Sequence, residues 1–369
     1  METQLDFVQW LHTDMALKIL SCLDDFADLI RASAVSRLWQ NIVISNGLSK
    51  KLCIKRFPQL SCITRIIEPN HNIMPAGDDQ ATNTIERVAV KRDHLAYVSL
   101  FRALTSFPQT YCIADPVSAS STDNYPQESV MNTLDPRDRV LHRYSYWSSK
   151  GSDNPDTPET LIYNLTASFC IITEIHLHPF QAMFHLHFPI YSSKFVRFRM
   201  GHPKCWNEID RDFIEVQECA DDKFIWTYTS KMFPVAQENR LQRFELPEPV
   251  VCIGGYLQVE LLGRVQKQED DDKYYICVAH VQAIGRQLSP AFCVEFSEQS
   301  NNVTLKYDAK EFEDKMQSVC NGQNGSLSTS LLPVAWGNLP DFIHIVQVHE
   351  DGAEHEWGDI DWIIDEFLN

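Results

Sequence analysis

The sequence predicts a multi-domain α + β protein with a three-helix module, a helical linker, an antiparallel β-sandwich and an acidic C-terminal tail. Three observations support this fold class. Apolar residues recur at helical spacing over residues 6–48. After Thr110 the spacing changes to a period of two, in short runs separated by Pro, Gly, Asn and Asp. The stretch from Asp341 to Asn369 contains nine acidic residues and neither Lys nor Arg.

The first module is expected to contain three short helices. The first begins at Thr13 or Asp14, the second after Asp25 and the third near Ser36, and the Asn-Gly pair at 46–47 ends the third. Helices this short cannot bury all of their apolar side chains among themselves. Part of the apolar surface is therefore expected to contact either a partner protein or the rest of the chain.

One ordered pattern runs through this module, and its positions are Leu11, Ile19-Leu20, Leu23, Asp28-Leu29, Val35-Ser36-Arg37 and Trp39. This pattern resembles the F-box. The resemblance implies docking on a Skp-family adaptor and, through it, on a cullin–RING ubiquitin ligase. The adaptor-binding residues that it implies, some of which would serve the module's own core, are Leu11, Met15, Ile19, Leu20, Leu23, Val35 and Trp39. The alternative is an ordinary helical subdomain packed on the rest of the chain.

One position departs from the family pattern, because His12 stands where the usual residue is proline. Proline fixes the backbone at the entry to a helix. Its replacement is expected to weaken adaptor binding somewhat.

Residues 49–109 are expected to form a helical linker with a loop at about 66–84. The segment from Ser49 to Phe107 is locally basic, but its basic residues are spread over a long span. A solvated helical surface explains this spread better than a nucleic-acid site. The net charge of −18 also disfavours polyanions.

Residues 110–297 are expected to form the sandwich, from runs such as ETLIYNL, IITEIHLHPF and FIEVQEC. The segments at 144–152 (YSYWSSKGS) and 243–263 (RFELPEPVVCIGGYLQVELLG) resemble a galactose-binding-like, discoidin-type β-sandwich. The whole order resembles a group of plant F-box proteins. Such sandwiches bind sugars, lipids, peptides or proteins through loops at one rim, and some are purely structural.

Aromatic and hydroxyl side chains near the sandwich rim are the candidate target-binding residues. They are Tyr146, Trp147, Ser148 and Ser149, with Trp206 in a second loop. The alternative for Trp147 is that it anchors the sandwich core.

Metal binding and catalysis are not expected. His176 and His178 form one HxH pair and His185 and His187 a second, a spacing that can suit zinc on a strand. The segment FHLHF at 184–188 also fits a plain amphipathic strand. No acid/base pair, phosphate loop or nucleophile elbow stands out, so we expect no cofactor and no enzymatic activity.

The compartment is expected to be the cytoplasm, the nucleus or both. No apolar run reaches the length of a membrane helix, and the N-terminus lacks a secretory signal pattern. The eleven cysteines form no CxxC pair and are expected to be reduced.

Residues 298–369 are expected to form a linker and an acidic tail. The tail has one amphipathic stretch. Its apolar face is Trp357, Ile360, Ile364 and Phe367. It can bind a partner's groove, fold back on the chain, or have no role.

The function predicted is that of the substrate-recognition subunit of an SCF-type (Skp–cullin–F-box) ubiquitin ligase. The F-box would dock the adaptor, and the sandwich or the tail would recruit an unknown protein target. The alternative is a lectin-like module that binds a glycan or a lipid head group without a ligase role. An enzyme built on the sandwich ranks last.

Overall fold

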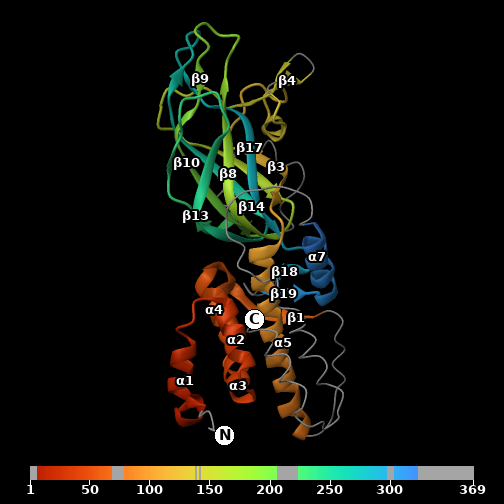
Figure 1. The fold of residues 1–369 in the computed structure, drawn as a ribbon. Helices are drawn as coiled ribbons and strands as arrows, with labels where there is room; N and C mark the ends of the chain where they lie inside the picture. Colours follow the sequence, from red (N-terminus) through yellow and green to blue (C-terminus); the bar gives the residue numbers. More distant parts are fainter. Residues whose placement is uncertain are drawn as a thin grey trace. The chain divides into compact units, whose positions relative to one another are not determined.

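The computed structural model describes residues 6–68, 79–137, 139–140, 143–205, 223–296 and 303–322. The first part is helical, as the spacing predicts (Figure 1). Its helices are η1 (Phe7–Trp10), α1 (Thr13–Leu20), α2 (Phe26–Ala34), α3 (Arg37–Ser45), α4 (Leu48–Arg56), η2 (Pro58–Cys62) and the long α5 (Asp79–Ser106). No described helix combines the length and apolarity that crossing a membrane requires.

Side-chain caps begin two of these helices where the sequence predicts them. Asp25 accepts a hydrogen bond from the Ala27 amide (2.8 Å), and Ser36 accepts one from the Trp39 amide (3.3 Å). Gly47 has φ 59° and separates α3 from α4, a conformation that glycine adopts at little cost. The first helix differs from expectation, because its cap residue is His12 and no side chain caps it.

Two antiparallel sheets form the sandwich. The first has the order β11 (Phe224–Thr229), β10 (Ser193–Pro203), β14 (Tyr256–Arg264), β7 (Glu159–Leu165) and β3 (Ile113–Ala119), with β12 (Phe233–Pro234) paired to β10. The second has the order β13 (Gln242–Ile253), β8 (Phe169–Gln181), β17 (Cys277–Gln287) and β2 (Thr110–Tyr111), with β6 (Trp147–Ser148) on β17 and β9 (Ile190–Tyr191) on β8.

Alternate side chains of these strands meet in the sandwich core, because successive residues of a strand face opposite sides. The buried cluster includes Leu161, Tyr163, Ile172, Ile175, Phe198 and Val259. The period of two in the sequence is therefore the pattern of the core-facing side chains. The run at 213–219 lies outside the described residues.

A third, small sheet joins segments that lie far apart in the sequence. Its strand β1 (Ile63–Ile67) runs parallel to β19 (Val303–Tyr307), which pairs antiparallel with β18 (Phe292–Phe296). The helix α7 (Ala309–Gly322) follows, and its Phe312 packs against Phe107 and Phe292. Residues 303–322 are thus a strand and a helix, where the composition suggested a linker. The remaining elements are η3 (Val130–Leu134) and the short hairpins β4 (Arg139–Val140) with β5 (Arg143–Tyr144) and β15 (Gln266–Lys267) with β16 (Tyr274–Tyr275).

Candidate functional site

One side of the N-terminal helical module is buried against α5. The Phe26 ring of α2 stacks on Phe101, with 4.3 Å between ring centroids. The Ser49 hydroxyl of α4 forms a 2.6 Å hydrogen bond with His94 Nδ1. Burial lowers the pKa of His94 to about 4, so this ring is neutral near pH 7. The module is therefore attached to α5 through packed aromatic and polar contacts.

A second set of large apolar side chains in the same module is exposed. Met15 and Ile19 lie four residues apart on α1, hence on one helix face. α1 and η1 both contact α3, so the three elements are neighbours. We call the exposed set the outer apolar face, and it consists of Trp10, Met15, Ile19, Val35 and Leu38. Met15 is 51% exposed and Val35 62%, a large apolar exposure for a module of this size.

The residues proposed from the sequence as adaptor contacts divide between surface and core. Met15, Ile19 and Val35 belong to the outer apolar face. Leu11, Leu23 and Trp39 are half-buried, and Leu20 is buried. Trp10 and Leu38 complete the face although the sequence pattern did not select them. The sequence features that could have indicated these two residues are their large apolar side chains and their positions within the module.

Trp39 also has a structural role. Its indole Nε1 donates a hydrogen bond to Asp6 Oδ1 (2.9 Å), and the same oxygen accepts from the Val8 amide (3.0 Å). The contact ties η1 to α3. It therefore positions Trp10, at the end of η1, on the outer apolar face.

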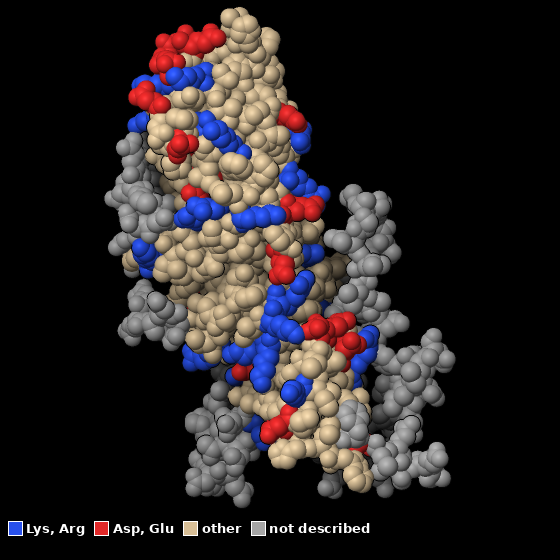
Figure 2. Space-filling view, turned by 90° about the vertical axis from the view of Figure 1, so that its left-hand side faces the viewer, with Lys and Arg blue, Asp and Glu red and all other residues tan. Residues whose placement is uncertain are grey.

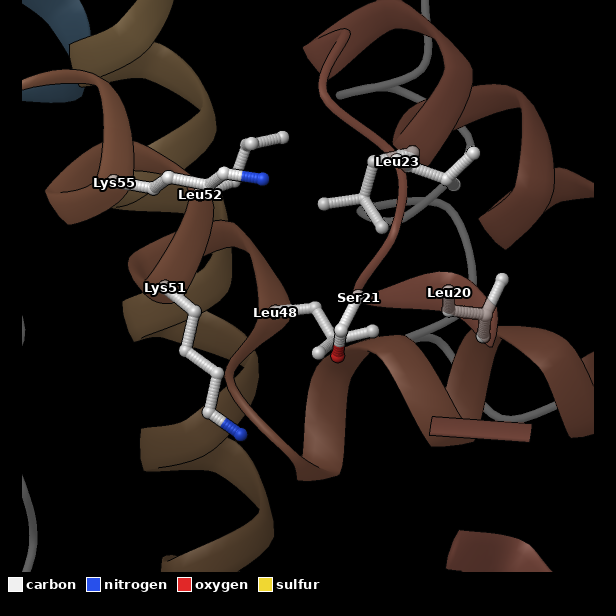
Figure 3. Close-up of a pocket in the computed structure, with 8 residues that line it drawn as sticks. Leu20, Ser21, Leu23, Leu48, Lys51, Leu52 and Lys55 are labelled. Carbon is white, nitrogen blue, oxygen red and sulfur yellow. The ribbon is translucent and has the colours of Figure 1, made fainter. Parts of the chain in front are cut away.

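Leu20 lines a shallow apolar pocket instead of the outer face. Figure 3 shows this pocket between α4, which contributes Leu48 and Leu52, and the connection from α1 to α2, which contributes Leu23. Two lysines of α4, Lys51 and Lys55, lie beside it, and Lys55 forms an ion pair with Asp24. The outer apolar face and this pocket are separate features of the module.

The residue in place of the family's proline has a backbone that proline itself could adopt. His12 has φ −61° and ψ 141°, and Leu11 before it is extended, at φ −90° and ψ 143°. Proline fixes φ near −65° and favours an extended residue before it. The exchange for histidine thus preserves the path of the chain into α1.

Trp147, a candidate rim residue, lies in the sandwich core and not at its surface. The side chain is fully buried, and its indole Nε1 donates to the Ser121 carbonyl (3.0 Å). Of the two interpretations of Trp147, the structure agrees with the one in which it anchors the sandwich core. An aromatic residue on a short strand packs inward here, because β6 pairs with the central strand β17.

Ser148 and Ser149, beside Trp147, are buried as well. Ser149 belongs to a hydrogen-bond network around the buried Arg264. Arg264 donates to the Ser149 hydroxyl (2.9 Å) and to the carbonyls of Lys150 (2.8 Å) and Tyr274 (2.9 Å). It also forms an ion pair with Glu159. Ser149 is thus part of a satisfied interior network, which leaves it no access to a ligand at the surface.

Ser148 and Tyr146 are engaged in internal contacts too. The Ser148 hydroxyl donates to the Ser149 carbonyl (3.2 Å). The Tyr146 ring stacks on Phe180 at 3.9 Å, and its hydroxyl donates to Glu128 (2.7 Å). Burial together with the Glu128 carboxylate raises the pKa of Tyr146. Trp206 and the tail residues Trp357, Ile360, Ile364 and Phe367 lie outside the described residues.

The histidine pairs lie in two different settings. His176 and His178 are on β8, whereas His185 lies in a turn between β8 and β9 with its Nδ1 2.9 Å from the Tyr191 hydroxyl. The expected strand at 184–188 is wrong, because His187 (φ 65°) and Phe188 (φ 50°) turn the chain back. Within the described ranges, no three potential metal ligands come together.

Charges of both signs are mixed on the surface. Figure 2 shows Lys and Arg side chains interspersed with Asp and Glu, and wide uncharged areas between them. On α4, for example, Lys55 is neutralised by Asp24.

Comparisons with known proteins agree with the helical geometry. The F-box-like family model matches residues 13–55, which span α1 to α4. Two solved structures have low similarity to this chain. CBM32-3 from a Clostridium perfringens family 31 glycoside hydrolase is 12% identical (47% of this chain, 90% of that chain, TM-score 0.31). Allantoicase from Saccharomyces cerevisiae is 12% identical (54% and 56%, TM-score 0.32).

A relative matches along nearly the whole length. F-box protein At4g00755 of Arabidopsis thaliana is 43% identical over 362 residues, which are 96% of this chain and 96% of the relative. The match therefore includes the sandwich as well as the helical module. The chain belongs to the F-box protein family.

Proposed function

We propose that this protein is the substrate-recognition subunit of an SCF-type ubiquitin ligase. Its F-box binds a Skp-family adaptor, and the rest of the chain recruits a protein target for ubiquitination. The adaptor links it to a cullin–RING assembly. The proposal includes residence in the cytoplasm, the nucleus or both.

The observation that carries the proposal is the division of the F-box into two faces. Phe26, Ser49 and Cys53 contact α5, whereas the residues of the outer apolar face are exposed in the described part of the chain. A module that only packed on its own chain would not need five large exposed apolar side chains. Such a surface is typical of a protein-binding site.

The contribution of this chain to the reaction would be positional. A target held on the receptor has its lysines at high effective concentration next to the ubiquitin-charged conjugating enzyme. The packed contacts between the F-box and α5 are consistent with this role, because they join the module to the rest of the chain. The chain itself would act as a receptor and not as a catalyst.

The test is co-purification of the full chain with a Skp-family adaptor, followed by calorimetric titration. The variant Ile19→Asp/Val35→Asp places two charges on the outer apolar face and should weaken binding by a factor of 100 or more. Leu241→Asp is the matched control, since Leu241 is also an exposed apolar residue but belongs to the sandwich region. It should bind as the wild type does.

Two results would contradict the proposal. The first is a folded wild-type chain, by circular dichroism, that does not bind the adaptor. The second is equal adaptor affinity of the wild type and the double variant. Unchanged melting temperatures of both variants show that a loss of binding is not a loss of folding.

A further inference from the structure

A turn at one end of the sandwich exposes an unusual number of large apolar side chains. It comprises residues 182–189 and joins β8 to β9. Its four exposed apolar residues are Met183, Phe184, Leu186 and Phe188, and Leu186 is 71% exposed. We call these four side chains the tip. Exposed apolar residues this close together mark an interaction site.

The tip is held in a fixed shape by its own hydrogen bonds. The Ala182 amide donates to the Pro189 carbonyl (2.9 Å) and the Phe188 amide to the His185 carbonyl (3.2 Å). Gln181 Nε2 also donates to the Phe188 carbonyl (3.0 Å). His187 and Phe188 have positive φ, which costs on the order of 1 kcal/mol or more for each residue. The turn keeps these unfavourable backbone angles while its apolar side chains are exposed, so it is preorganised for binding.

The tip continues into a groove on the same end of the sandwich. The Phe184 ring lies 5.4 Å from Tyr144 and 6.1 Å from Phe180, and both of these line the groove together with Met183 of the tip. Polar lining comes from Arg137, Arg139 and Asn239. Tip and groove thus form one surface with an apolar and a polar part.

Among the described residues, the charged side chains that line this groove are Arg137 and Arg139. Arg139 lies 4.4 Å above the Tyr144 ring and donates to its hydroxyl. Arg137 pairs with Asp135 next to the groove. In a chain of net charge −18, a groove whose charged lining is basic favours an acidic partner.

Two described carboxylates near this surface, Glu128 and Asp271, are already engaged. Glu128 accepts from the Tyr146 hydroxyl (2.7 Å), and Asp271 accepts from the Tyr275 hydroxyl (2.6 Å). The Tyr275 bond lowers the pKa of Asp271, so that group stays ionised and bonded. These acids do not neutralise Arg139, whose contacts are made with Tyr144.

The surface lies at the end of the sandwich away from α5. At one end of β8, Phe169 accepts from the Leu288 amide, and nearby Arg286 donates to the Phe107 carbonyl just past α5. At the other end, Phe180 pairs with Tyr191 beside the tip. A strand of 13 residues is roughly 40 Å long. A target at the tip would therefore not collide with α5.

We propose that the tip and its groove are the target-docking surface of this receptor, and that they bind a protein segment in which apolar and acidic residues alternate. The apolar side chains would pack on the tip, and a carboxylate would pair with Arg139. The proposal rests on the receptor function proposed above. It commits to a peptide segment, because the tip offers four exposed apolar side chains and the groove beside it an arginine, which fit several successive side chains of a peptide.

The experiment is fluorescence polarisation with three labelled twelve-residue peptides and the full chain. The first peptide combines Leu and Phe with Asp and Glu, the second has Lys in place of the acids, and the third has Ser in place of the apolar residues. We expect the first peptide to bind at least ten-fold more tightly than the other two. Leu186→Asp and Arg139→Glu should each reduce that affinity at least ten-fold, and Leu241→Asp should not.

Charge reversal separates a docking role from a structural one. If Arg139 pairs with the ligand's carboxylate, Arg139→Glu should gain affinity for the Lys-containing peptide, which a merely misfolded tip could not do. Equal binding of the three peptides, or no effect of Leu186→Asp, would overturn the proposal. So would tip-dependent binding of galactose or of anionic vesicles in place of the first peptide. Adaptor titration of the same samples shows separately whether the receptor function holds.

Discussion

The F-box and the sandwich tip both present large apolar side chains to solvent, but they do so by different means. On the F-box, Met15 and Ile19 are exposed because they lie on the side of α1 that the rest of the chain does not cover. At the tip, Leu186 and Phe188 are exposed because a turn with positive φ angles points away from the sheets. A helix surface follows from spacing, whereas a turn surface follows from backbone geometry.

This difference decides what each surface can tolerate. Met15, Ile19 and Leu38 project from α-helices, so a substitution that keeps the helix changes only the surface. The tip depends on the hydrogen bonds that close it and on the strands β8 and β9 beneath it. Changes deep in the sandwich should therefore affect the tip and spare the F-box.

The largest effect is expected for Arg264→Met. Its side chain is 1% exposed and that of its partner Glu159 5%. Removing the arginine leaves the carboxylate buried without a cationic partner, although the Ser120 and Ser121 hydroxyls still donate to it, and this costs roughly 3 kcal/mol or more. Urea unfolding monitored by tryptophan fluorescence should show that loss, whereas adaptor affinity, measured below the transition, should stay close to wild type.

Arg240→Met is the matched control, because Arg240 forms an ion pair with Glu238 on the surface, where both side chains are more than half exposed. Its cost should stay below about 0.5 kcal/mol. Equal stabilities for the two variants would contradict the role assigned to the buried network, and adaptor affinity lost with Arg264→Met would contradict the independence of the two surfaces.

An intermediate effect on the F-box side is expected from pH. The pKa of His94 is lowered from 6.5 to about 4 in the folded protein by burial, so below pH 6.5 the unfolded chain binds a proton that the folded chain excludes. The contribution to stability is complete above pH 6.5 and is lost as the pH falls towards 4, by about 3 kcal/mol in all. Melting temperatures measured between pH 7.5 and 4.5 should therefore decrease.

His94→Gln isolates this contribution, since glutamine can still hydrogen-bond Ser49 but does not titrate. The variant should lose less stability than the wild type over the same pH range. The pKa of His280 in the sandwich is also lowered by burial, and it contributes equally to both proteins. Parallel curves for variant and wild type would show that His94 titrates normally.

The smallest effect is expected for His12→Pro. The backbone at this position already has the φ of proline, so the exchange should stabilise the F-box by about 0.4–1 kcal/mol through the unfolded state. Calorimetry should show equal or tighter adaptor binding. Lys18→Pro, inside α1, is the opposite case and should disrupt the helix. A lower melting temperature for His12→Pro would disprove the compatibility of this backbone.

Local chemistry allowed the first three α-helices and several sandwich strands to be predicted from the sequence. The caps at Asp25 and Ser36 and the strand at 159–165 are where their residue types place them. The burial of Trp147 was not predictable, because an aromatic residue serves a core and a rim equally well until the pairing of β6 with β17 is known.

Long-range pairing accounts for the other differences. The strand at 303–307 depends on β1, which lies more than two hundred residues earlier, and nothing in its own few residues reveals that partner. The turn at 184–188 has the same apolar alternation as a strand, and only its φ angles distinguish the two. Of the outer apolar face, the family pattern indicated Met15, Ile19 and Val35, while Trp10 and Leu38 required the solvent exposure of each side chain.

The pairing of β1 with β19 also sets an order of events during synthesis. Thr64 Oγ1 donates to the carbonyl of Val303 (3.2 Å), and 239 residues separate the two. At about 5–20 residues per second, β1 waits roughly 10 to 50 s after leaving the ribosome before its partner strand emerges. The F-box helices contact one another and α5, which ends at Ser106, so they can fold during that interval. A nascent chain can therefore carry a surface ready for the adaptor before the sandwich that would select the target has been completed.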